Sequence, residues 1–223
     1  MNRALHWEIV PRAGTGRLRY SLAMRYLALG DSYTIGEAVL EAERFPVQLV
    51  QRLGEAGHAD APTPLIIATT GWTTDELSAG IDAASPAGPF DLVTLLIGVN
   101  NQYRGWPLEA YRQEFAVLLR RAIGFAGGEP GRVIVVSIPD WGVTPFAAGR
   151  DRRAIAADID AFNAVNAEEA RRQGARRVDI TPISRLALDQ PELTASDGLH
   201  PSGEMYRLWV ERILPEARAA LRS

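Results

Sequence analysis

The stretch LALGDSYTIGE, residues 27–37, joins an apolar run to an abrupt polar break. The apolar run Tyr26–Leu29 predicts a strand buried on both faces, because it is short and does not alternate with polar residues. The strand is followed by Gly30-Asp31-Ser32, which places one small hydroxyl side chain where the strand gives way to a loop. A serine in that position can form a turn, cap a helix or act as a nucleophile. The remaining sequence decides which of these three roles Ser32 has.

Four further apolar runs share the pattern of the first. They are Leu65–Ala68, Leu92–Ile97, Val133–Ile138 and Val178–Ile180. Segments with apolar residues at helical spacing occur at 45–53, 108–122, 155–170 and 205–221. Pro46 suits a first helical turn, and Ser202 with Glu204 suits the start of the last helix. Strands that alternate with helices predict an α/β fold, with three α/β/α layers around a parallel five-stranded sheet.

The length of 223 residues fits one domain, which we place at 24–223 after an N-terminal extension at 1–23. The chain is 47% hydrophobic and 23% charged, as is typical of globular proteins. It has no cysteine, which excludes disulfides and thiolate chemistry. Its three histidines, His6, His58 and His200, are too few and too scattered for a histidine-rich metal site. We therefore expect neither a metal nor a cofactor.

The net charge is −3, so the chain has no basic surface for nucleic acid, and we expect a small-molecule partner. No stretch approaches the about 20 apolar residues of a membrane span. The first 20 residues lack the continuous apolar segment of a secretion signal, which favours a cytoplasmic location. Nothing in the sequence indicates an oligomeric state.

Small or polar residues follow several of the predicted strands. Gly71 follows the second strand, Asn100 follows the third, and Asp197 and His200 lie beyond the fifth. The carboxyl ends of parallel strands meet at one edge of a sheet, where such folds bind ligands. Together with Ser32, these residues supply the nucleophile, oxyanion donors, base and orienting carboxylate that acyl transfer requires. Histidine suits the base because its ordinary pKa of about 6.5 lets it accept and return a proton near neutral pH.

The same residues carry a family resemblance. Gly30-Asp31-Ser32-Tyr33 resembles the opening block of the GDSL, or SGNH, hydrolases. Gly71, Gly98-Val99-Asn100 and Asp197-Gly198-Leu199-His200 follow in the order and approximate spacing of the remaining blocks. The resemblance spans roughly residues 26–221 and implies a flavodoxin-like sheet that hydrolyses esters without a cofactor.

By this resemblance Ser32 is the nucleophile, His200 the base and Asp197 the carboxylate that orients it. The backbone N–H groups of Ser32 and Gly71 and the side chain of Asn100 would form the oxyanion hole. The third block of the family usually ends in aspartate, and Asn101 stands there in this chain. We therefore expect Asn101 to be structural and its loop to be held differently.

Aromatic residues follow several strands. Tyr33, Trp72, Tyr103 and Trp141 either line an acyl or aryl pocket or pack against the protein, and the sequence does not separate the two roles. The segment 150–153, with three arginines around Asp151, is expected to be a solvated helix start.

The leading hypothesis is a serine esterase for short-chain acyl or acetyl esters, acting through an acyl-enzyme. A lysophospholipase or thioesterase of the same family is the alternative. From another class, a ligand-binding module without catalysis on a doubly wound sheet is also compatible with the pattern. A nucleotide site is disfavoured because the chain has no Gly-x-Gly-x-x-Gly loop and no lysine. The Gly-x-Ser-x-Gly elbow of other hydrolases is absent, since Thr34 occupies its last position.

Overall fold

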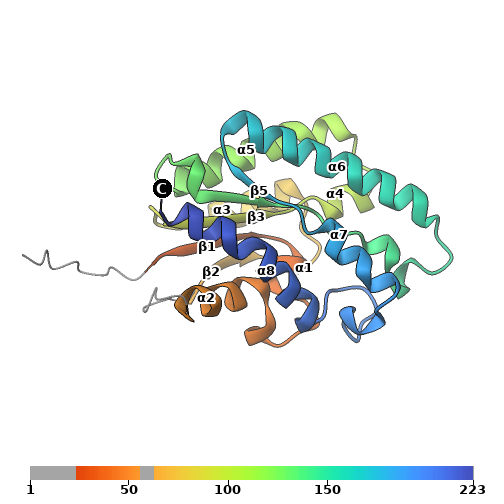
Figure 1. The fold of residues 1–223 in the computed structure, drawn as a ribbon. Coiled ribbons are helices and arrows are strands. Elements are labelled where there is room, and N and C mark those ends of the chain that lie inside the picture. The colour runs from red at the N-terminus through yellow and green to blue at the C-terminus, as the bar shows by residue number, and fades with distance from the viewer. Residues whose placement is uncertain (1–23, 56–62, 223) are drawn as a thin grey trace, which may run out of the picture.

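The computed structural model describes residues 24–55 and 63–222 (Figure 1). The predicted N-terminal extension at 1–23, with His6, and the loop residue His58 lie outside the described residues. The elements of the described chain pack on one contiguous cluster of buried apolar side chains that lies on both faces of the sheet. Within this part of the chain, no helix combines the length and the apolar character needed to span a membrane.

The centre of the fold is a five-stranded parallel sheet. Its strands are β1 (Tyr26–Gly30), β2 (Leu65–Ala68), β3 (Leu92–Leu96), β4 (Val133–Val136) and β5 (Arg176–Val178). The spatial order is β2-β1-β3-β4-β5, the doubly wound order of flavodoxin-like folds. In the register, Leu27 of β1 lies between Leu65 and Val93. The predicted fold class is therefore confirmed.

Helices cover both faces of the sheet. They are α1 (Ser32–Ile35), α2 (Phe45–Glu55), α3 (Thr74–Ala84), α4 (Val99–Tyr103), α5 (Leu108–Phe125), α6 (Arg152–Gln173), α7 (Thr181–Ser184) and α8 (Gly203–Ala220). Short 3₁₀ turns lie at Glu41–Glu43, Pro130–Arg132, Trp141–Val143, Pro145–Ala147, Arg185–Leu188 and Pro191–Leu193. Helices α2 and α8 pack together on one face, and α3, α5 and α6 cover the other (Figure 1).

The predicted helix starts agree with the structure. Pro46 is the second residue of α2. The N–H groups of a first helical turn have no acceptor within the helix, so a proline costs no hydrogen bond there. Ser202 caps α8, and its Oγ accepts a hydrogen bond of 3.3 Å from the N–H of Met205. Glu204 lies in the first turn of α8, where a negative charge favours the helix dipole.

The fifth strand differs from the prediction. The apolar run Val178–Ile180 predicts a strand, but β5 covers Arg176–Val178 and pairs only with β4. At this sheet edge Arg176 reaches Glu216 at 3.0 Å, so arginine is tolerated in a strand. Ile180 instead turns the chain toward α7, and its N–H donates to Ser137 Oγ at 2.8 Å. The edge position explains why the apolar run is displaced by two residues from the strand itself.

Candidate active site

A pocket lies where the carboxyl ends of β1, β2 and β3 meet the loop before α8. It brings together four of the five residues predicted for the triad and the oxyanion hole, namely Ser32, Gly71, Asn100 and His200. These residues come from four separate segments of the chain, as the parallel topology requires. A hydroxyl near the start of the fold and an imidazole near its end therefore line the same pocket.

Ser32 is the first residue of α1, directly after β1 and Asp31. Asp31 caps this short helix, and its Oδ1 accepts a hydrogen bond of 3.0 Å from the N–H of Tyr33. The turn is tight at Gly30, where a Cβ would overlap Thr34 Oγ1 and the carbonyl oxygen of Leu96. Glycine thus lets the chain turn sharply and places Ser32 at the wall of the pocket.

His200 and Asp197 form a close pair. His200 Nδ1 lies 2.6 Å from Asp197 Oδ2, and Asp197 Oδ1 accepts the backbone N–H groups of Leu199 and His200 at 2.9 and 3.0 Å. Burial would raise the pKa of Asp197, but the hydrogen bonds from His200 and the backbone outweigh it, so the pKa lies below its ordinary value. Asp197 is therefore an ionised partner for Nδ1, which leaves Nε2 of His200 to exchange a proton.

Ser32 and His200 line the same pocket, but no hydrogen bond joins their side chains among the described residues. In free enzymes such bonds are often long and shorten when substrate binds. The His200 ring is also fixed from the side by Tyr33, whose ring meets it edge-on with centroids 5.6 Å apart. The imidazole is thus held in place by two neighbours while its reactive nitrogen stays unpaired.

The three residues predicted to supply N–H donors all line this pocket. The backbone N–H groups of Ser32 and Gly71 donate no hydrogen bond within residues 24–55 and 63–222. Gly71 has a φ of +87°, a conformation that glycine adopts without strain. Asn100 Nδ2 donates to the carbonyl oxygen of Trp72 at 2.9 Å, which fixes the amide and leaves its second N–H available.

The loop that carries Gly71 is held by a residue that the sequence does not single out. Arg104 Nη2 donates to the carbonyl oxygen of Gly71 at 2.8 Å, and Nη1 lies 3.3 Å from Glu76 Oε2. Glu76 in turn accepts the N–H of Thr73 at 2.8 Å. The peptide of Gly71 is therefore braced from its carbonyl side. Arg104 lies 33 positions away in sequence, so no local pattern links the two residues.

Asn101 has the structural place expected of it. Its Oδ1 accepts the N–H of Thr74 at 3.2 Å, and its Nδ2 donates to Thr74 Oγ1 at 2.8 Å. The hydroxyl proton of Thr74 goes to Glu114, so the hydroxyl needs a donor in return. An amide can donate and accept at the same residue, whereas an ionised aspartate can only accept. Asn101 thus ties the loop of Asn100 to the start of α3.

The four predicted aromatic residues occupy different places. Tyr33, Tyr103 and Trp141 line the pocket, together with Phe146, which no pattern in the sequence singles out. Trp72 is not among the lining residues. Its indole packs against α3, so closely that a Cβ on Gly80 would overlap it.

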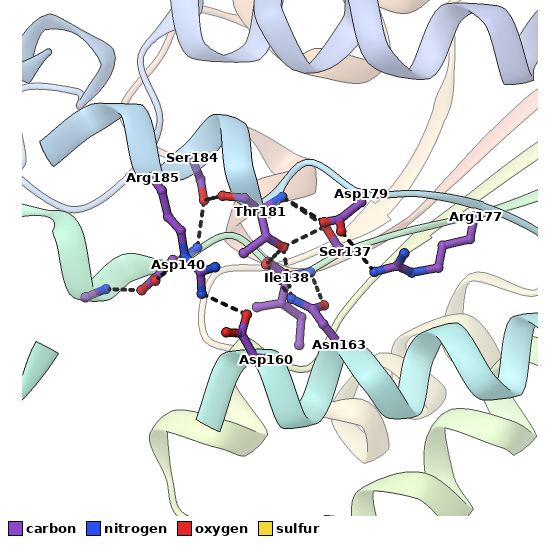
Figure 2. A network of polar contacts seen from close by, with 11 residues as sticks. Ser137, Ile138, Asp140, Asp160, Asn163, Arg177, Asp179, Thr181, Ser184 and Arg185 are labelled. Carbon is purple, nitrogen blue, oxygen red and sulfur yellow. Dashed lines mark hydrogen bonds and ion pairs between the residues drawn. The ribbon is translucent and has the colours of Figure 1, made fainter. Parts of the chain in front are cut away.

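A polar network holds the loop that carries Trp141 (Figure 2). Asn163 of α6 pairs with both backbone groups of Ile138, at 2.7 and 3.0 Å. Asp140 is buried, accepts Arg185 Nε at 2.9 Å and accepts the N–H of Gly142 at 2.9 Å. These contacts come from α6 and from the segment after α7, so the start of the loop after β4 is fixed from two sides (Figure 2).

Asp31, beside Ser32, is a buried carboxyl with one unpartnered oxygen. Oδ2 has no hydrogen-bond partner among the described residues. Burial raises the pKa of Asp31 to about 7, despite the hydrogen bond from the N–H of Tyr33. The fold therefore favours the protonated carboxyl over a wide pH range in which the unfolded chain is ionised.

We expect Asp31 to make the protein less stable as pH rises. Below pH 4 the side chain is protonated in both states and has no effect. Between pH 4 and 7 only the unfolded chain ionises, so the free energy of unfolding falls by up to about 1.4 kcal/mol per pH unit. Above pH 7 the loss is complete. Asp31→Asn should remove this dependence, measured as the difference in urea unfolding between variant and parent from pH 4 to 8.

The comparison with the parent isolates Asp31, because carboxyls with a lowered pKa, such as Asp197, act in the opposite direction and remain in both proteins. A difference between the two proteins that stays constant with pH would show that the fold does not raise the pKa of Asp31 above its value in the unfolded chain.

Solved structures share this fold at low sequence identity. A member of the lipolytic G-D-S-L family from Veillonella parvula matches at a TM-score of 0.66 and 17% identity, covering 86% of this chain and 97% of its own. The acetylxylan esterase Axe2 from Geobacillus stearothermophilus matches at 0.65 and 17%, covering 88% and 96%. The psychrotrophic esterase EstA from Pseudoalteromonas, inhibited by monoethylphosphonate, matches at 0.59 and 17%, covering 89% and 99%. No curated protein sequence matches the chain.

These likenesses, with the strand order, define the class of fold as the three-layer α/β/α sandwich of GDSL hydrolases. The chain belongs to the GDSL-like lipase/acylhydrolase family, whose sequence model matches residues 28–208. The resemblance read from the sequence is thereby confirmed, and with it the enzyme class, an ester hydrolase.

Proposed function

We propose that the protein hydrolyses carboxylic esters with short acyl groups through Ser32, His200 and Asp197. The observation that supports this most directly is the pairing of His200 Nδ1 with Asp197 at 2.6 Å in a loop whose histidine shares one pocket with Ser32. A binding module has no need for an imidazole oriented by a carboxylate beside a hydroxyl.

In the first half of the reaction, Ser32 Oγ attacks the carbonyl carbon while His200 Nε2 takes the hydroxyl proton. The oxyanion that forms is stabilised by the N–H groups of Ser32 and Gly71 and by the Asn100 amide. The carbon–oxygen bond to the alcohol then breaks, and His200 returns its proton to the leaving alcohol oxygen. Asp197 stays ionised and stabilises the imidazolium.

In the second half, water attacks the acyl-enzyme and gives a proton to His200. The second tetrahedral intermediate collapses, the bond to Ser32 Oγ breaks, and the proton returns to that oxygen. The products are the carboxylic acid and the restored hydroxyl. No other reagent is required.

The preference for short acyl groups rests on the size of the pocket. Its volume is about 170 Å³, and it is bounded by the aromatic side chains of Tyr33, Trp141 and Phe146. The name of the Geobacillus neighbour, an acetylxylan esterase, describes a short acyl group as well. A long chain would have to displace these rings or lie outside the pocket.

The purified protein should hydrolyse p-nitrophenyl acetate and butyrate with a kcat/KM about tenfold or more above that for the octanoate. The reason is that the bounded pocket accepts only the first few carbons of the acyl chain. Initial rates of p-nitrophenol release at fixed pH, below the critical micelle concentration of the octanoate, provide the measurement. Equal or greater efficiency on the octanoate would contradict the proposed acyl preference, and no turnover of any ester would contradict the proposed function.

A further inference from the structure

A guanidinium lies over three aromatic rings that belong to the pocket lining. The carbon at the centre of the Arg150 guanidinium lies 5.3 Å from the ring centroids of Tyr103 and Trp141 and 5.2 Å from that of Phe146. Arg150 Nη2 is 3.2 Å from the Tyr103 hydroxyl oxygen. All three rings also line the pocket that holds Ser32. Arg150 is therefore not simply part of a solvated helix start, as its sequence suggests.

The charge of Arg150 is not neutralised by an acid. None of the ion pairs in the described part of the chain includes Arg150. The neighbouring carboxylate, Asp151, caps α6 and accepts the N–H groups of Arg153 and Ala154 at 3.0 and 3.1 Å. A guanidinium has five N–H donors, and the Tyr103 hydroxyl occupies one direction only. Arg150 thus keeps both its charge and most of its donors for a ligand.

The wall beneath Arg150 is held by hydrogen bonds to several segments of the chain. Trp141 Nε1 donates to Gln102 Oε1 at 2.9 Å, and the network of Figure 2 fixes the chain just before Trp141. The N–H of Phe146 donates to the carbonyl oxygen of Gly198 at 2.9 Å, which ties the wall to the loop of Asp197 and His200. A site whose groups are already ordered loses little entropy when it binds a ligand.

The rings offer an apolar surface as well as support. Tyr103 and Phe146 are 47% and 42% exposed, which is high for large apolar side chains. An occupant that covers the rings and reaches the guanidinium must combine an apolar part with a negative charge. Arginine binds a carboxylate or phosphate through two parallel hydrogen bonds, which a neutral group cannot match.

We propose that Tyr103, Trp141, Phe146 and Arg150 form a subsite for an anionic group of the substrate, a carboxylate or phosphate carried on an aromatic or other apolar portion of the ester. This inference rests on the proposed ester hydrolysis at Ser32. The exposed rings of Tyr103 and Phe146 bind the apolar portion, the buried ring of Trp141 supports them, and Arg150 binds the anion.

The test compares matched esters that differ in charge. With the charge on the alcohol, 4-carboxyphenyl acetate is compared with phenyl acetate. With the charge on the acyl group, monophenyl succinate is compared with phenyl 4-methylpentanoate. In at least one pair the wild type should have a higher kcat/KM for the anionic ester than for the neutral one. Arg150→Gln should lower the ratio of the anionic kcat/KM to the neutral kcat/KM about tenfold. Arg150→Lys should retain part of the preference, and Arg153→Gln, an exposed arginine without a ring contact, should leave the ratio unchanged.

A merely structural role of Arg150 would lower both members of a pair and leave the ratio unchanged, which would overturn the proposal. A wild type without a preference for the anion in either pair would overturn it too, even if the neutral esters are hydrolysed and the proposed function stands. If no ester is hydrolysed, the proposed function fails by itself. The subsite is then judged by calorimetric binding of 4-acetamidobenzoate against acetanilide, where tighter binding of the anion that Arg150→Gln abolishes supports it and equal binding rejects it.

Discussion

Replacing Ser32 by alanine is expected to lower kcat for p-nitrophenyl acetate by about four to six orders of magnitude. Without the hydroxyl no acyl-enzyme can form, and what remains is the stabilisation of a water attack by the oxyanion donors and by binding. The loss should appear in kcat rather than in KM, because Ser32 touches the reacting carbon only as the new bond forms.

The fold should survive this change. The Ser32 hydroxyl makes no hydrogen bond in the described part of the chain, and α1 is capped by Asp31 instead. Thermal melting of Ser32→Ala should therefore match the parent closely.

A phosphonate reagent adds an independent measurement of the same residue. Intact mass should show one adduct on the wild type, located at Ser32 by peptide mapping, and none on Ser32→Ala. Full activity in Ser32→Ala, or an adduct at another residue, would remove Ser32 from the proposed mechanism.

The strands could be read from the sequence because burial on both faces leaves an unmistakable composition. Strands β1, β3 and β4 are buried at every position, and each coincides with an apolar run. Strand β5 could not be placed the same way, because its arginines find carboxylates at the sheet edge and the apolar residues belong to the next turn. Helix α3 could not be predicted from apolar spacing, because Leu77 and Ile81 are the only large apolar side chains that it buries.

The positions of the candidate-site residues could be predicted where each residue follows its own strand. Ser32, Gly71 and Asn100 needed only the rule that parallel strands end at one edge. The supporting contacts were not predictable, because they join segments far apart in sequence, such as Arg104 with Gly71. The two tryptophans also show that position in the sequence does not decide what a side chain contacts. Trp72 and Trp141 both follow a strand, but one packs on Gly80 and the other lines the pocket, and only tertiary packing separates them.

Gly98→Ala is expected to destabilise the protein by about 2–6 kcal/mol. Gly98 precedes α4 with a φ of +125°, where a side chain is strained by about 1–3 kcal/mol. Its Cβ would also overlap the Tyr111 hydroxyl and lie 2.8 Å from Tyr111 Cε2. Tyr111 is fully buried, and its hydroxyl lies 2.6 Å from Asn166 Oδ1, so it has no free space to move into, and overpacking adds about 1–3 kcal/mol.

Urea unfolding at a fixed pH measures the loss in the free energy of unfolding, and kcat measures the effect of the substitution on the site. Because Asn100 lies two residues after Gly98, a displaced α4 should lower kcat as well. Gly124→Ala is the matched control: Gly124 lies within α5, no heavy atom is within 4 Å of its Cβ position, and alanine there should stabilise by about 0.5–1 kcal/mol. Tyr111→Phe combined with Gly98→Ala removes the hydroxyl overlap and should recover part of the loss. If Gly98→Ala is as stable as Gly124→Ala, the close contact between Gly98 and Tyr111 does not exist in the folded protein.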